Sequence, residues 1–103
     1  MKKIGIRGTV FDKMNSLYGK FYQDRTERFH RAIKDNLFRT AAEILFEFPE
    51  TPKKLARIYA YHIINSGNRV YLETAQKFIG RKFNQSEMNR FKKVAEVANI
   101  MHS

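Results

Sequence analysis

Apolar residues recur every three or four positions along most of the chain, a spacing typical of amphipathic helices. A first helix is expected to begin at Thr9, where Thr9 and Asp12 form a capping-box pattern and apolar positions follow as far as Phe21. Residues 1–8 are polar and interrupted by glycine, which indicates either a short edge strand or a flexible basic arm. The helical part is therefore expected to start only after residue 8.

The most regular apolar pattern predicts a second helix over residues 25–47. It opens with a capping box formed by Asp24 and Glu27, and its apolar stripe continues to Phe48. From Leu37 onward the remaining sides of this helix are apolar as well. This segment is expected to be either the buried centre of the fold or part of a dimer interface.

Prolines and glycines divide the rest of the chain into shorter helices. Thr51 followed by Pro52 is typical of an N-cap with proline at the first helical position. That third helix is expected to end at Gly67, which can adopt the left-handed conformation. A fourth helix is expected over about residues 69–79, with Gly80 as its stop.

The last helix is predicted from a third capping box, in which Asn84 precedes Glu87 by three residues. Apolar positions then continue at helical spacing from Met88 to Met101. The whole pattern predicts an all-α fold, a compact bundle of about five helices joined by short turns. A chain of 103 residues is long enough for one hydrophobic core, so residues 9–103 are expected to form a single helical domain.

The charge of the chain is strongly basic and unevenly distributed. Twenty Lys and Arg residues oppose ten Asp and Glu residues, which gives a formal net charge of +10. Residues 51–103 carry +7 and residues 1–22 carry +4, whereas residues 23–50 carry −1. A basic surface of this kind attracts polyanions, and nucleic acid is the commonest polyanion inside a cell.

Several kinds of chemistry are not expected from this sequence. The chain has no cysteine, which excludes disulfides, thiolate metal ligands and thiol nucleophiles. The histidines His30, His62 and His102 are not spaced as a metal pair, and there is no glycine-rich phosphate loop. The sequence therefore predicts no cofactor, no metal and no enzymatic activity. Because no export signal or membrane-spanning stretch is visible, a cytoplasmic location without membrane binding is expected.

Polar and basic side chains gather at the start of the last predicted helix and in the turn before it. Arg, Asn and Gln at an exposed helix N-terminus can reach base edges, whereas Ser and Lys reach phosphates. A second basic cluster lies on the first turns of the third helix, where a merely solvated face is an equally good interpretation. The candidate nucleic-acid contacts are Arg81, Lys82, Gln85, Ser86, Asn89, Arg90 and Lys93 in the first group, and Lys53, Lys54 and Arg57 in the second.

Exposed aromatic rings would offer a further contact, because they stack on unpaired bases. Tyr61 and Phe83 are the best placed for this role, since they lie off the main apolar stripes and near basic residues. The alternative is that the aromatic residues of this chain pack in the core, which is the commoner role of such side chains.

The sequence thus predicts a non-enzymatic nucleic-acid-binding protein, with double-stranded DNA favoured over RNA, that acts in transcription regulation or as an accessory factor. The alternative is a helical protein-interaction module, an inhibitor or adaptor that docks on an acidic surface of a larger complex. A homodimer is also compatible with the sequence, because Phe38, Leu45 and Phe46 leave the second helix apolar on more sides than one small core can cover.

Overall fold

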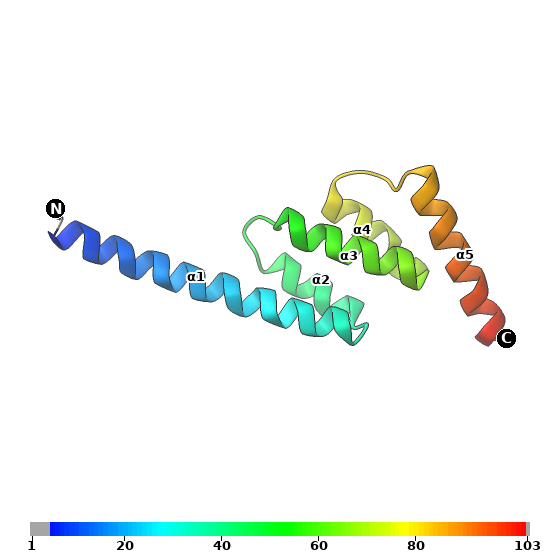
Figure 1. The fold of residues 1–103 in the computed structure, drawn as a ribbon, viewed down its shortest axis with the longest axis horizontal. Helices are drawn as coiled ribbons and strands as arrows, with labels where there is room; N and C mark the ends of the chain where they lie inside the picture. The colour runs from blue at the N-terminus through cyan, green and yellow to red at the C-terminus, as the bar shows by residue number, and fades with distance from the viewer. Residues whose placement is uncertain (1–4, 103) are drawn as a thin grey trace.

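In the computed structural model of the protein, the described backbone, residues 5–102, consists of helices joined by short turns (Figure 1). Side chains are described for residues 19–98. The predicted all-α class is confirmed, with five α-helices in the described backbone. They are α1 (Gly5–Lys34), α2 (Phe38–Phe46), α3 (Lys53–Ser66), α4 (Leu72–Ile79) and α5 (Gln85–His102), with a 3-10 turn, η1 (Arg69–Tyr71), directly before α4.

The helix α3 is at the centre of the arrangement, because it packs against α1, α2, α4 and α5. In Figure 1 the C-terminal half of α1, α2 and α3 lie side by side, and α5 crosses close to the C-terminal end of α3. The N-terminal half of α1 extends beyond the other helices in this view. The bundle proper is therefore built from the second half of α1 and the four helices that follow it.

The predicted boundary between the first two helices, near Asp24, is wrong because α1 continues through it. Thr26 Oγ1 donates to the Tyr22 carbonyl oxygen at 2.8 Å, a bond that a hydroxyl makes in a helix interior. The Asp24 carboxylate accepts from Arg25 Nη1 at 3.0 Å, so its partner is a side chain and not a free backbone N–H at a helix start. The residue pattern of a capping box occurs here in the middle of a helix.

The start of the first helix also differs from the prediction. The helix α1 begins at Gly5, ahead of the expected start at Thr9. Residues 5–8 are therefore helical, so the strand alternative is wrong for them. The rest of that expectation, residues 1–4, lies outside the described residues.

The long helix predicted over residues 25–47 is interrupted at Asn36, which has a φ of 59°. The Asn36 N–H donates to the Ile33 carbonyl at 3.0 Å, and the Leu37 N–H donates to the Ala32 carbonyl at 2.8 Å. This pair of bonds is a Schellman motif, which ends α1 and reverses the chain into α2. Asparagine tolerates the left-handed conformation better than other non-glycine residues. The apolar spacing continues across the turn, which is why periodicity alone predicted one helix.

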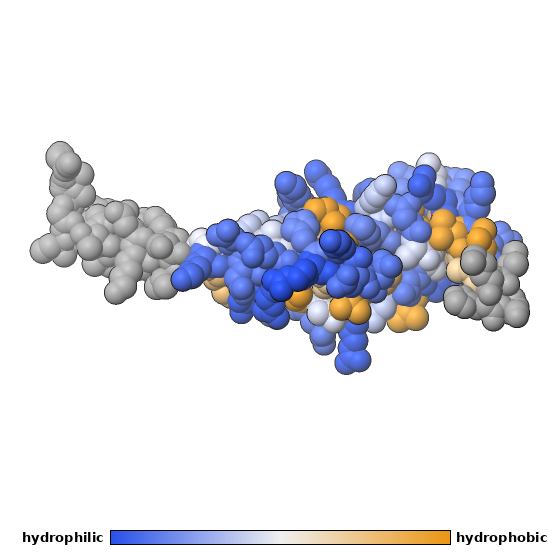
Figure 2. Space-filling view, turned by 60° about the horizontal axis from the view of Figure 1, so that its bottom comes forward, coloured by the Kyte–Doolittle hydropathy of each residue, from blue (hydrophilic) through white to orange (hydrophobic). Residues whose placement is uncertain are grey.

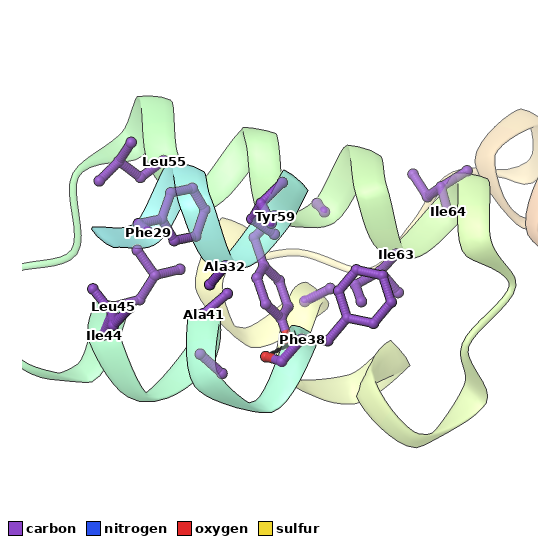
Figure 3. Close-up of a cluster of buried hydrophobic side chains, with 14 of the residues drawn as sticks. Phe29, Ala32, Phe38, Ala41, Ile44, Leu45, Leu55, Tyr59, Ile63 and Ile64 are labelled. Atoms are coloured by element: carbon purple, nitrogen blue, oxygen red, sulfur yellow. Dashed lines mark hydrogen bonds between the residues drawn. The ribbon is translucent and has the colours of Figure 1, made fainter. Parts of the chain in front are cut away.

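Apolar side chains from α1, α2 and α3 form the core shown in Figure 3. Phe29 and Leu45 are fully buried, and Tyr59 points from α3 between the other two helices. The Tyr59 hydroxyl donates to the Phe38 carbonyl oxygen at 3.1 Å, so its one polar atom is satisfied. Burial, together with the neighbouring Tyr71 hydroxyl, raises the pKa of Tyr59 well above its ordinary value.

The extra apolar residues of the second predicted helix lie largely inside this core. Phe38 and Leu45 are buried, so the argument for a dimer interface is wrong for these two residues. Phe46 stays 64% exposed, and the centroid of its ring lies 4.9 Å from the centroid of the Phe78 ring. On the face shown in Figure 2, hydrophobic residues form separate small patches among hydrophilic ones. The homodimer stays a prediction, and Phe46 is the one of its three residues that is exposed.

The predicted ends of α3 and α4 are confirmed, since Gly67 (φ 64°) and Gly80 (φ 71°) both adopt the left-handed conformation. The predicted cap of α3 is wrong by one residue. Pro52, not Thr51, occupies the N-cap position, and no side chain caps this helix. A close approach holds α5 against the end of α3, because a Cβ added at Gly67 would lie 2.5 Å from the Ala95 backbone nitrogen.

Ion pairs connect α1 to the end of α2. Arg25 Nε lies 2.9 Å from Glu47 Oε1, and Arg28 Nη1 lies 3.6 Å from the same oxygen. The Arg25 guanidinium also lies over the Phe21 ring, 4.1 Å from its centroid. Acidic and basic side chains in this nearly neutral part of the chain therefore neutralise one another, whereas the excess basic residues of residues 51–103 have few such partners.

Candidate nucleic-acid interface

A groove runs along α3, on the side that faces the end of α4 and the start of α5. It consists of three adjoining hollows that share lining residues: Arg57 and Arg81 line the first and second, and Tyr61 and Glu87 line the second and third. We call it the α3 groove and define it by Lys53, Arg57, Tyr61, Arg81, Glu87 and Arg90. It brings together two basic clusters that are far apart in the sequence.

One wall of the α3 groove is a single face of α3. Lys53, Arg57, Tyr61 and Asn65 follow one another at intervals of four residues, which places them along one side of the helix. Leu55, Tyr59 and Ile63, on the other side of α3, are buried in the core, and the buried Ile64 lies at the floor of the groove. The groove wall is therefore attached to the best-packed helix of the fold.

The other wall is held in place by Glu87 at the start of α5. Arg81 donates from Nη1 and Nη2 to the two Glu87 carboxylate oxygens, at 2.8 and 3.0 Å. Glu87 Oε1 also accepts from the Asn84 backbone N–H at 2.8 Å, and the Glu87 N–H donates to Asn84 Oδ1 at 2.8 Å. These reciprocal bonds confirm the predicted capping box. The loop before α5 is thereby fixed to the first turn of that helix.

This ion pair shifts the pKa of both partners. The Arg81 guanidinium, helped by the Asn84 amide, holds the pKa of Glu87 below its ordinary value, although partial burial acts in the opposite direction. Glu87 in turn raises the pKa of Arg81. At neutral pH the groove therefore contains a charged carboxylate that competes with any anionic ligand for Arg81.

Other predicted base-reading side chains are bonded to protein groups as well. Arg90 Nε donates to Asn65 Oδ1 at 2.6 Å, which ties α5 to α3 across the groove. Gln85 Nε2 donates to Asn89 Oδ1 at 2.8 Å. Side chains that already use their donors in this way are less suited to bidentate recognition of a base edge. The arrangement favours contacts with phosphates over sequence-specific contacts with bases.

All ten sequence-predicted contact residues are exposed, but only half of them lie in the groove. The structure thus joins parts of the two predicted clusters into one surface and leaves the others on its outside. Lys53, Arg57, Arg81, Ser86 and Arg90 line the groove, whereas Lys54, Lys82, Gln85, Asn89 and Lys93 do not.

The two aromatic candidates have opposite environments. Tyr61 is 57% exposed and lines the groove, as a stacking residue must. Phe83 is 6% exposed and belongs to the core, so the stacking hypothesis is wrong for it. Its backbone N–H donates to Gln76 Oε1 at 2.8 Å, which turns the loop inward and buries the ring.

The roles of Asn65 and Glu87 in this groove are not visible in the sequence. The partner of Asn65, Arg90, lies 25 residues away in the sequence, so no local pattern connects them. Glu87 was identified as a cap, without its pairing to Arg81. The interval of four residues from Lys53 to Asn65 is the one signal in the sequence that could have indicated the α3 wall.

Within residues 19–98, no group of three or more His, Cys, Asp or Glu side chains is placed to hold a metal ion. No helix in the described part of the chain is long and apolar enough to cross a membrane. Comparisons of the chain with protein-family models, curated proteins and solved structures find no match. The functional interpretation therefore depends on the geometry and charge of the groove itself.

Proposed function

We propose that the protein binds nucleic acid through the α3 groove and does not catalyse a reaction. The observation that carries this proposal is that Lys53, Arg57, Arg81 and Arg90 line one continuous groove although they come from three segments of the chain. A row of cations along a hollow follows a phosphate backbone. A binding protein of this kind would act as an accessory or regulatory factor.

The charge around the groove supports the same proposal. Residues 51–103 contain ten basic residues against Glu73, Glu87 and Glu96, which gives this part of the chain a charge of +7. Among the ion pairs of residues 19–98, Arg81 is the one groove cation that has a carboxylate partner. Binding of phosphates to the remaining cations would release condensed counterions, which is the main source of affinity in non-specific nucleic-acid binding.

A second candidate function is the protein-interaction module, and Phe46 is the observation that favours it. This ring is 64% exposed and is not among the residues that line the groove. An exposed aromatic ring is a common anchor at protein interfaces. An adaptor that binds through Phe46 would keep its partner when the groove cations are replaced.

The test is fluorescence anisotropy of labelled oligonucleotides of about 20 nucleotides, single-stranded and duplex, titrated with the protein at several salt concentrations. Logarithmic affinity is expected to fall linearly with logarithmic salt, at about −0.7 per phosphate contact for a single strand and about −0.9 for a duplex. No binding of either probe at low salt would refute the proposal and leave the adaptor hypothesis.

A pair of matched variants locates the binding surface. Arg57→Gln is expected to weaken binding about threefold to tenfold and to reduce the salt slope by about one contact, because Arg57 lines the groove. Arg39→Gln makes the same change of charge on α2, at a side chain that is 82% exposed and outside the groove. It is expected to have little effect. Equal losses from both variants would mean that net charge, and not the α3 groove, attracts the nucleic acid.

A further inference from the structure

We infer that the α3 groove takes a single nucleic-acid strand, with one unpaired base stacked on the ring of Tyr61. This inference rests on the proposed function and specifies its ligand. Two features carry it: the exposure of Tyr61 and the cations on either side of it.

Tyr61 differs from the core tyrosine of the same helix in its surroundings. Tyr59 is fully buried, whereas Tyr61 is 57% exposed and lines two of the three hollows. The aromatic neighbour of Tyr61 in the described part of the chain is His62, whose ring is inclined by 86° to it, with centroids 5.8 Å apart. The Tyr61 ring is thus not stacked face to face on a protein ring. An aromatic ring in this state is suited to stack on a base.

Two arginines flank this ring along the groove. Arg57 precedes Tyr61 by one helical turn on α3, and Arg90 is bonded to Asn65, which follows Tyr61 by one turn. Neither arginine has an ion-pair partner among residues 19–98. A base on Tyr61 would therefore have a cation on each side of it for the neighbouring phosphates. The hollow at Tyr61 is also lined by Ile64 and Ile79, apolar side chains that favour a base over water.

The stacking contact on Tyr61 suits a single strand and not a duplex. The α3 wall from Lys53 to Asn65 spans twelve residues, which is about 18 Å at the helical rise. A wall of this length can contact several successive nucleotides of one strand. A duplex keeps the faces of its bases stacked on one another, so Tyr61 could not reach them. The contacts inferred here use phosphates and base faces, which single-stranded DNA and RNA share.

The experiment compares labelled oligothymidine and oligouridine of about 12 nucleotides with a duplex hairpin that has the same number of phosphates. Each is titrated into the wild-type protein, Tyr61→Ala and Tyr61→Phe, with far-UV circular dichroism to show that the variants are folded. Both single strands are expected to bind more tightly than the hairpin. Tyr61→Ala is expected to weaken strand binding about tenfold to a hundredfold, whereas Tyr61→Phe keeps the ring and retains most of the affinity.

An abasic strand of equal length separates stacking from charge. It keeps the phosphates but has no base, so its weaker binding is expected to be the same for wild type and for Tyr61→Ala. Two outcomes would overturn the inference while the proposed function stands: hairpin and strands that bind equally well, or a Tyr61→Ala variant that binds the strands as wild type does, each with Arg57→Gln still impaired. The absence of binding to any probe would overturn both.

Discussion

At the scale of single residues, two glycines have the same backbone conformation and different surroundings. Gly67 and Gly80 both have positive φ values, at which a side chain is strained by about 1–2 kcal/mol. A Cβ at Gly80 would meet nothing within 4 Å, whereas a Cβ at Gly67 would lie 2.5 Å from the nitrogen and 2.7 Å from the Cα of Ala95. Both of these Ala95 atoms are backbone atoms of α5, so no rotation of a side chain can relieve the overlap.

We therefore expect Gly67→Ala to lower the free energy of unfolding by about 2–5 kcal/mol and Gly80→Ala by only about 1–2 kcal/mol. The measurement is urea denaturation followed by circular dichroism, with the two variants compared in the same buffer. Similar losses in both variants would show that α5 can move away from residue 67 at little cost.

Glu87 has two opposing roles, one in stability and one in binding. It caps α5 and pairs with Arg81, and in doing so places a negative charge in the α3 groove. Glu87→Gln can keep the capping-box bond, because glutamine also accepts from the backbone at this position. The variant is expected to bind nucleic acid several-fold more tightly at neutral pH, with a salt slope steeper by about one contact because Arg81 becomes available. Unchanged affinity would show that Arg81 does not contact the ligand.

The same carboxylate predicts a pH dependence of stability. Arg81 lowers the pKa of Glu87 in the folded state, so the contribution of the pair is complete above the ordinary pKa of 4.5. It is lost as the pH falls through the lower pKa of the folded protein. Thermal melts of wild type and Glu87→Gln are expected to differ most above about pH 5 and to converge as the pH is lowered. A difference that does not shrink as the pH is lowered would contradict this account.

At the scale of helices and turns, Asn36 decides where α1 ends. It supplies the left-handed residue of the Schellman motif between α1 and α2. Asn36→Ala is expected to destabilise the protein by about 1 kcal/mol, whereas Asn36→Gly is expected to be neutral or slightly stabilising. Urea denaturation checks both values, with Asp35→Ala as a neighbouring control outside the left-handed position. A loss of stability in the glycine variant equal to that in the alanine variant would refute the conformational explanation.

The capping boxes show how far helix boundaries could be predicted from the sequence. The box at Asn84 is confirmed because a loop precedes it, so the N–H groups of the first turn need partners. The box at Asp24 is not a cap, since helix α1 continues on both sides and those N–H groups are already bonded. The same residue pattern thus has different structural roles in the two places, and no local rule distinguishes them. Glycine stops were more reliable, because few residues other than glycine adopt a positive φ.

At the scale of the whole molecule, the sequence predicted the helical class and the basic character but not the shape of the binding surface. Apolar periodicity determines the class, because each helix must bury one face. The α3 groove depends on contacts over long sequence distances, such as Arg90 with Asn65, and on the loop that brings Arg81 next to Arg57. Composition and local spacing contain no information on such contacts. This is why half of the predicted contact residues lie outside the groove.

The central position of α3 has a consequence for the thermodynamics of binding. The helix that supplies the cations and the tyrosine of one groove wall packs against α1, α2, α4 and α5, so this wall is rigid before any ligand arrives. The backbone of this wall then loses little conformational entropy on binding, and the ordering cost falls on the exposed groove side chains and on the flexible ligand. A preorganised wall of this kind makes affinity depend on how easily the ligand straightens, which favours flexible strands over those that fold on themselves.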